Sequence, residues 1–215
     1  IVGLSNLPRG LYYSQDAGLN AGLNWHLASV LDAPNTPITP GSVSSIVYNS
    51  TLHKFFAVIR FHGVYSSPDG INWSRLANQP GNLNLTSCPT ATLPQPNCPL
   101  YRGELAVRPG VSALGNEMYI WYVDTNDNNQ GIFQTLDGGN SGNNWTPISV
   151  AGITNGCVFK EPGCGSDQGG YNLTIAAVPT SSGTDLYAGA VNLFKCSISS
   201  SNQTCSNSGS WLNLT

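Results

Sequence analysis

The stretch that decides the fold reads GVYSSPDGINW and runs from Gly63 to Trp73. Its first residues include a valine and a tyrosine, which both favour strands. Proline, aspartate and glycine then favour a tight turn, and the chain resumes at a tryptophan. We predict a β-hairpin whose turn is held by hydrogen bonds to the carboxylate of Asp69, with Gly70 in the left-handed backbone region.

The same pattern recurs along the chain. GLYYSQD at 10–16 and GIFQTLD at 131–137 share with 63–69 the order glycine, aliphatic, aromatic, any, serine or threonine, any, aspartate. A fainter copy, NLFKCSI at 192–198, lacks the aspartate. Each copy is followed by a tryptophan, the last three are preceded by two further strand-like runs, and no stretch keeps an apolar period of 3.6 residues. The chain is therefore predicted to be all-β, with repeated units of four short strands.

These turns resemble the Asp-box, or BNR, repeat of the β-propellers of the sialidase-like, sortilin-like and xyloglucanase-like superfamily. That repeat reads Ser/Thr-x-Asp-x-Gly-x-x-Trp and lies between the third and fourth strands of a blade. The resemblance implies a β-propeller with four-stranded antiparallel blades. The spacing departs from the family pattern, because Trp73 comes one residue early while Trp25 and Trp145 come late. The residues given a structural role by the resemblance are Ser14, Asp16, Trp25, Ser67, Asp69, Gly70, Trp73, Thr135, Asp137, Gly139 and Trp145.

The repeat predicts one propeller segment over residues 1–215, with about three and a half blades. The units span approximately 1–30, 42–80, 104–150 and 171–215, and the first is partial because only its last two strands, from Gly10 to Val30, are expected. Propellers usually close a ring of about four to eight blades. We expect a section of a larger propeller, completed by the remainder of a longer chain. A four-bladed ring with one deficient blade, or a partner that supplies the missing strands, are the alternatives.

The six cysteines fall into close pairs, and each pair brackets a stretch rich in Pro, Gly, Ser or Asn. Neighbour pairing would give three disulfides: Cys88–Cys98, Cys157–Cys164 and Cys196–Cys205. Zinc binding is the alternative, but it favours closer spacing and a nearby histidine. Disulfides predict an oxidising compartment, and thus an extracellular or cell-surface protein.

Charge and hydropathy exclude several classes of function. Only 9% of the residues are charged, against about 25% in an average domain, and the net charge is −3. No basic stripe indicates nucleic-acid binding, and no apolar run of about 18 residues indicates a membrane span. The partners we expect are a glycan or an extracellular protein.

The longest insertions occupy 28–41, 77–103 and 151–170, with a shorter one at 124–131. In propeller geometry they lie on the face opposite the Asp-box turns, which in this superfamily holds the ligand site. The candidate binding residues in these insertions and at their edges are Tyr101, Arg102, Glu104, Asp124, Asp127, Lys160, Glu161, Asp167 and Tyr171. Arg102 and Glu104 have an alternative role, since they can pair with each other across a strand end. The oxygens of DTNDNN, from Asp124, suit Ca²⁺, but the distal glutamate of a calcium loop is absent, so no metal or cofactor is predicted.

Two functions fit these residues. The first is a non-catalytic recognition or scaffold module for a glycan or a protein. The second is a glycoside hydrolase, xyloglucanase-like or sialidase-like, that uses Asp124 or Asp127 with Glu161 or Asp167. No motif selects a pair, so no catalytic residue is predicted. A cleft with two carboxylates about 5–10 Å apart would favour the hydrolase.

Overall fold

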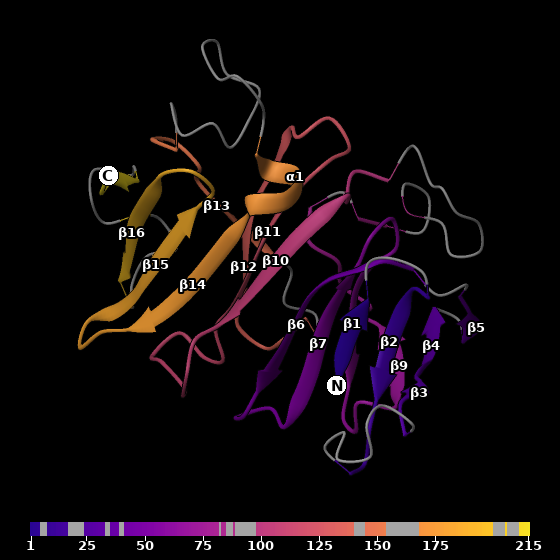
Figure 1. Cartoon of the computed structure of the whole chain (residues 1–215). Coiled ribbons are helices and arrows are strands. Elements are labelled where there is room, and N and C mark those ends of the chain that lie inside the picture. Colours follow the sequence, from indigo (N-terminus) through magenta and orange to yellow (C-terminus); the bar gives the residue numbers. More distant parts are fainter. Residues whose placement is uncertain are drawn as a thin grey trace.

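The computed structural model shows an all-β chain whose strands form four separate sheets (Figure 1). It describes residues 1–4, 8–16, 24–32, 35–38, 41–81, 83–84, 88, 98–139, 145–153, 168–199, 205 and 211–215. Within these residues the only helix is α1 (Gly169–Asn172), a single turn. No described helix is long enough and apolar enough to cross a membrane.

The first sheet has the order β1-β2-β3 and is antiparallel throughout. Its strands are β1 (Val2–Leu4), β2 (Gly10–Tyr13) and β3 (His26–Leu27). The two strands predicted for this unit are thus joined by a third, because Val2–Leu4 pairs with β2. So short a segment carries too little alternation to be recognised as a strand in the sequence.

The second sheet has the order β5-β4-β9-β8-β7-β6. The predicted four-stranded unit consists of β6 (Val43–Asn49), β7 (Lys54–Ile59), β8 (Gly63–Ser67) and β9 (Asn72–Arg75). Two more strands, β4 (Ser29–Asp32) and β5 (Thr36–Pro37), extend it beyond β9. The insertion 28–41 is therefore not only a loop: β4 pairs with β9 in parallel, with Val30 opposite Trp73.

The third and fourth sheets are simple antiparallel meanders. The third contains β10 (Arg102–Val107), β11 (Met118–Val123), β12 (Asn129–Thr135) and β13 (Thr146–Ile148). The fourth contains β14 (Thr174–Pro179), β15 (Gly183–Gly189), β16 (Leu193–Ser199) and β17 (Leu212–Asn213). Disulfides join Cys196 to Cys205 and Cys88 to Cys98, which are two of the three neighbour pairs predicted. The third pair, Cys157 and Cys164, lies outside the described residues.

Successive sheets lie side by side through their first strands. β1 contacts β6, β6 contacts β10, and β10 contacts β14. The hydroxyl of Ser44 on β6 bonds both the N–H and the C=O of Gly103 on β10, at 3.1 and 2.8 Å. Likewise the N–H of Leu105 donates to the hydroxyl of Ser45 over 3.1 Å. These bonds align the starts of neighbouring first strands, so the units share one orientation.

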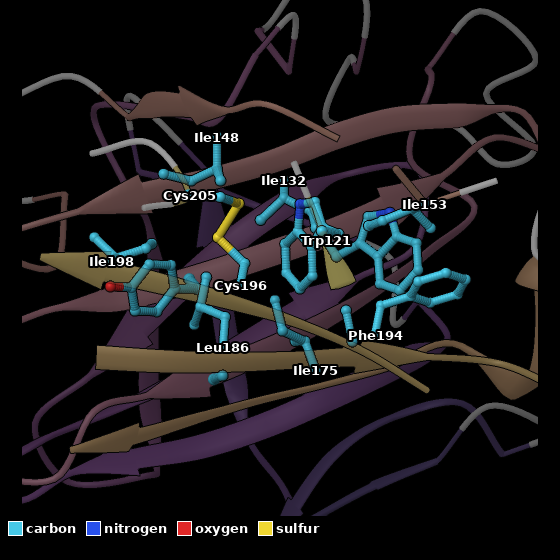
Figure 2. Packing of buried hydrophobic residues seen from close by; sticks show 14 of the residues in the cluster. Trp121, Ile132, Ile148, Ile153, Ile175, Leu186, Phe194, Cys196, Ile198 and Cys205 are labelled. Carbon is cyan, nitrogen blue, oxygen red and sulfur yellow. A yellow bond between two sulfur atoms is a disulfide. The ribbon is translucent and has the colours of Figure 1, made fainter. Parts of the chain in front are cut away.

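The core consists of three hydrophobic clusters, one at each junction between neighbouring sheets. Figure 2 shows the cluster between the third and fourth sheets, where Trp121 and Ile132 meet Phe194 and the Cys196–Cys205 disulfide. Side chains alternate along the strands, so the second and third sheets each bury one face against the sheet before and the other against the sheet after. In β7, for example, Ala57 and Ile59 pack toward the first sheet, while Phe56 and Val58 pack toward the third.

The turn between β8 and β9 shows how the repeated aspartate works. The Asp69 carboxylate accepts hydrogen bonds from the N–H groups of Ile71 and Asn72, each at 2.8 Å, and from the Asn72 side chain at 2.9 Å. Ser67 supports the turn by accepting from the Gly70 N–H over 2.8 Å, and Gly70 has a φ of 74°. These bonds to the charged form hold the pKa of Asp69 well below its usual range.

The other two copies use related bonds. In the third sheet the Gly139 N–H donates to Asp137 over 2.9 Å and to the hydroxyl of Thr135 over 3.1 Å. In the first sheet Ser14 donates to Asp16, which also accepts from the Asn24 side chain at 2.6 Å. The aspartates therefore accept hydrogen bonds within three separate hairpin connections. In the fourth sheet the corresponding connection, after β16, contains the Cys196–Cys205 disulfide.

Candidate functional site

The connections opposite the aspartate turns form one surface, which we call the loop face. It contains the turn between β7 and β8 (60–62), the segment before β10 (98–101), the turn between β11 and β12 (124–128) and α1. In Figure 1 α1 lies beside the start of β10, and Arg102 bonds join the two. The starts of β10 and β14 both lie at this face, so the connections that precede these two strands meet there although they are distant in sequence.

An arginine and two aromatic side chains meet near the start of β10. The guanidinium carbon of Arg60 lies 4.6 Å from the ring centroid of Tyr101, a cation–π contact. Phe61 approaches the same ring at 6.0 Å between centroids. The Nε of Arg60 is buried and has no hydrogen-bond partner among the residues that the structure describes.

Arg102 connects β10 to α1 through hydrogen bonds and an ion pair. Its Nη2 lies 2.8 Å from Glu104 Oε1, so the predicted alternative, pairing within the strand, is present. Its Nη1 also donates to the carbonyl of Tyr171 over 2.6 Å, which anchors α1. The ring of Tyr171 remains 55% exposed. Arg102 thus positions a tyrosine at the surface while it neutralises a carboxylate.

Glu104 is a partly buried carboxylate on this face, 2.8 Å from Arg102. Burial raises its pKa, and the neighbouring Arg102 opposes that shift through charge and hydrogen bonding. Ser45 and Arg60 favour the charged form as well. Glu104 is therefore a partly buried carboxylate next to Arg102 and under the influence of the charge of Arg60.

The turn between β11 and β12 contains two aspartates, Asp124 and Asp127, which make different contacts. Asp124 accepts hydrogen bonds from the N–H groups of Asn126 and Asn128, and its other oxygen accepts from the side chains of Asn128 and Gln130. These bonds occupy the carboxylate within its own loop. Asp127 instead packs against α1, because a Cβ placed on Gly170 would lie 2.6 Å from its Oδ1.

The loop face brings together several residues selected from the sequence. Five of them lie there around the start of β10: Tyr101, Arg102, Glu104, Asp127 and Tyr171. Asp124 lies nearby as the support of its loop, and Lys160, Glu161 and Asp167 fall outside the described residues. Sequence reasoning missed Arg60, because RFHG looks like the end of a strand and not like a turn between two long strands. The basic and aromatic composition of RFHG was the feature of the sequence that could have identified Arg60 as a binding candidate.

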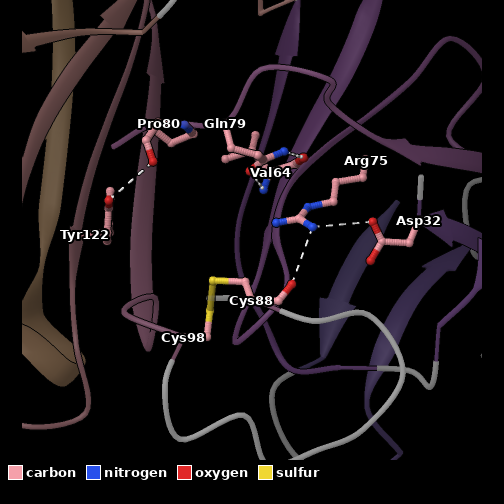
Figure 3. Close-up of a disulfide and its surroundings, with 8 residues drawn as sticks. All are labelled: Asp32, Val64, Arg75, Gln79, Pro80, Cys88, Cys98 and Tyr122. Atoms are coloured by element: carbon pink, nitrogen blue, oxygen red, sulfur yellow. Dashed lines mark hydrogen bonds and ion pairs between the residues drawn. A yellow bond between two sulfur atoms is a disulfide. The ribbon is translucent and has the colours of Figure 1, made fainter. Parts of the chain in front are cut away.

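A second group of polar side chains lies buried under the second sheet (Figure 3). Asp32, at the end of β4, pairs with Arg75 at the end of β9, with 3.6 Å between Oδ1 and Nη1. Arg75 also donates to the Cys88 carbonyl over 3.4 Å, which links the pair to the Cys88–Cys98 disulfide. The parallel pairing of β4 with β9 brings these side chains together, so neither could be identified from the sequence.

His62 and Tyr65 complete this buried group. Within the described part of the chain, neither ring nitrogen of His62 has a hydrogen-bond partner, and the hydroxyl of Tyr65 has none either. Burial and the charge of Arg75 lower the pKa of His62 to about 4. Burial likewise raises the pKa of Tyr65. The group is closed to solvent, so its effect is on stability and not on ligand binding.

Comparison with known protein families, curated proteins and solved structures finds no match. Among the described residues, no three His, Cys, Asp or Glu side chains are grouped so as to hold a metal ion. A function must therefore be argued from the geometry of the loop face.

Proposed function

We propose that this chain is an extracellular recognition module that binds a glycan on its loop face. The observation that carries the proposal is the contact of Arg60 with Tyr101 beside α1. Tyr101 Cε1 would lie 3.4 Å from a Cβ on Gly170, and the next residue, Tyr171, is 55% exposed. Loops on a rigid scaffold are the usual location of binding residues. The two disulfides support the extracellular assignment, because such bonds persist in oxidising compartments.

The chemistry of the face suits a sugar better than a large apolar protein surface. Tyrosine rings offer flat apolar area, while arginine and glutamate offer directed hydrogen bonds. The partly exposed side chain of Arg60 supplies hydrogen-bond donors, and the exposed side chain of Tyr171 supplies a flat apolar surface. A sugar ring combines an apolar face with several hydroxyls, so it can use both groups at once.

We also propose that the sheets are blades of a β-propeller of the Asp-box type. Three observations support this: the four-stranded meanders, the neighbouring first strands, and the repeated aspartate turns at the edge opposite the loop face. On this proposal the aspartates are structural, and recognition belongs to the other face.

A glycan array tests the binding function. Wild-type protein is expected to bind a restricted set of glycans, and Tyr171→Ala is expected to weaken that binding at least tenfold. Tyr48→Ala is the matched control, since Tyr48 is 48% exposed on β6 and lies near the opposite edge. Failure of every glycan to bind, or equal losses in both variants, would argue against the proposal.

A glycoside hydrolase is the second candidate, and the raised pKa of Glu104 is the observation that favours it. A general acid in these enzymes needs such a raised pKa, and the second carboxylate would be Asp127. Incubating the array's best glycan with wild type and Glu104→Gln decides between the two functions. Release of shorter products by wild type alone would establish hydrolysis, whereas unchanged glycan with retained binding supports recognition.

A further inference from the structure

One turn of the loop face contains a residue in a backbone conformation that its side chain disfavours. The turn between β7 and β8 is closed by a hydrogen bond of 3.1 Å from the N–H of His62 to the carbonyl of Ile59. Phe61, the third residue of this turn, has a φ of 64°. Type II turns have a left-handed φ at this position and usually place glycine or asparagine there. A bulky side chain at this position is strained, so its contacts must offset the strain.

The other left-handed residues show that Phe61 is the exception. Apart from glycines, the described residues with a positive φ are Asn35, His53, Phe61 and Asp127. Asparagine, aspartate and histidine adopt this region several-fold more often than most non-glycine residues. Among these four, only Phe61 belongs to a type for which the conformation is unusual. Strained residues of this kind cluster at functional sites, where the surrounding structure fixes them.

Two backbone hydrogen bonds fix the turn to neighbouring segments. The N–H of Arg60 donates to the carbonyl of Ser42, before β6, over 2.8 Å. The N–H of Phe61 donates to the carbonyl of Leu100, before β10, also over 2.8 Å. Leu100 is completely buried. The backbone of the strained residue therefore joins the turn to the segment that contains Tyr101.

The ring of Phe61 contacts the same segment. Its centroid lies 6.0 Å from that of Tyr101, with 50° between the ring planes, which is within the range of favourable aromatic pairs. The guanidinium carbon of Arg60 lies 4.6 Å from the centroid of the same Tyr101 ring. Two successive residues of the turn thus contact one tyrosine. A glycine or asparagine at position 61 would suit the backbone but would remove one of these two contacts.

The Tyr101 ring also approaches α1. A Cβ placed on Gly170 would lie 3.4 Å from Tyr101 Cε1, so the ring borders the backbone of this helix. Rotation of the ring would therefore alter both the contact with Arg60 and the packing beside α1. A second aromatic ring against Tyr101 restricts such rotation.

We propose that Phe61 is a positioning residue of the loop face. Its ring holds the ring of Tyr101, and through Tyr101 it holds the guanidinium of Arg60, in the arrangement that a ligand meets. This inference rests on the proposed function, because it gives Phe61 a role in the same site. Phe61 acts through Tyr101 and need not touch the glycan itself.

The variant Phe61→Asn tests this role. Asparagine suits the left-handed backbone, so relief of strain is expected to offset the lost ring packing and leave the urea midpoint little changed. Binding of the strongest glycan from the array, measured by calorimetry, is expected to weaken at least tenfold. Phe61→Tyr keeps the ring and is expected to bind within twofold of wild type. Circular dichroism checks folding, and Phe61→Leu replaces Phe61→Asn if that variant does not fold.

The matched control is His53→Asn. His53 has a φ of 50° and lies in the turn between β6 and β7, at the edge that holds the aspartate turns. The same substitution is thus made in a left-handed residue remote from the loop face. Glycan binding within twofold of wild type is expected for this variant.

A second measurement needs no glycan. In wild type the Arg60 side chain lies over the Tyr101 ring, so its Cδ protons are expected to be shifted upfield in the nuclear magnetic resonance spectrum. Phe61→Asn should reduce this shift, while Phe61→Tyr and His53→Asn should keep it. An unchanged Arg60 shift in Phe61→Asn, or glycan binding by that variant within twofold of wild type, would overturn the inference. A reduced shift in a chain whose wild type binds no glycan would contradict the proposed function while supporting the positioning of Tyr101 by Phe61.

Discussion

The indole N–H of Trp145 and the carbonyl of Asn78, which are 67 residues apart in the chain, form a hydrogen bond of 3.0 Å between two neighbouring sheets. Trp145 is only 6% exposed and lies in a cluster with Leu76 and Leu83, which follow β9. Trp145 and Trp211 therefore each join two sheets, whereas the indole N–H of Trp73 donates to the Gly70 carbonyl in its own turn over 3.0 Å.

Replacement of Trp145 by phenylalanine should weaken this junction. The change removes one buried hydrogen bond and part of the ring, so we expect a loss of about 1–3 kcal/mol in the free energy of unfolding. Trp211→Phe should cost a similar amount, because its indole makes the equivalent bond. Urea denaturation measures both, with the exposed Tyr48→Phe as control. Losses no larger than that of the control would contradict the role given to the tryptophans.

The aspartate turn should make stability depend on acid. The folded-state pKa of Asp69 is depressed, so its contribution is present above its unfolded pKa and is lost as pH falls toward the folded value. Asp69→Ala should therefore destabilise the protein at pH 7 and have a smaller effect near pH 2. Urea midpoints of wild type and variant at both pH values check this. An effect equal at both would show that the carboxylate's charge is irrelevant.

His62 should also make stability fall with acid, but over a higher pH range than Asp69. Its pKa falls from 6.5 in the unfolded chain to about 4 in the folded state, so the unfolded state binds more protons between these values. Stability should be full above about pH 6.5 and decline by up to about 3 kcal/mol as pH falls to about 4. His62→Gln should flatten this decline, as followed by urea denaturation from pH 4 to 7. A variant with the same slope as wild type would assign the decline to other groups.

The buried pair of Asp32 and Arg75 should be intolerant of single changes. Arg75→Met leaves a buried carboxylate without its cation, so we expect a loss of about 3–5 kcal/mol. The double variant Asp32→Leu with Arg75→Met removes both charges and should recover much of that stability. Thermal and urea unfolding of the two single variants and the double variant complete the cycle. A double variant no more stable than the Arg75→Met protein would mean that the pair contributes through other contacts.

Local patterns in the sequence predict much of this fold, because strands and turns depend on neighbouring residues. Alternation and the repeated turn locate β6 to β17, and proximity locates two disulfides. The strand β4 escapes prediction because its partner β9 is far along the chain, and nothing in SVLD indicates parallel pairing. The pair of Asp32 with Arg75 escapes for the same reason.

The loop face is only partly predictable. Tyr101, Arg102 and Tyr171 are found because they lie at the edges of long insertions, which commonly hold binding residues. Arg60 lies in a tight turn, and its contact with Tyr101 depends on how the second and third sheets pack. The packing of one sheet on another cannot be predicted from the positions of these residues in the sequence, so the contact between Arg60 and Tyr101 could not be predicted either.

The measurement that tests the central claim most directly is a nuclear magnetic resonance titration of the isotope-labelled chain with its strongest glycan from the array. Our account predicts that saturating shifts cluster at Arg60, Tyr101 and Tyr171, while Gly70 and Gly139 in the aspartate turns remain unchanged. Shifts centred on Gly70 and Gly139, with none at Tyr101, would contradict it.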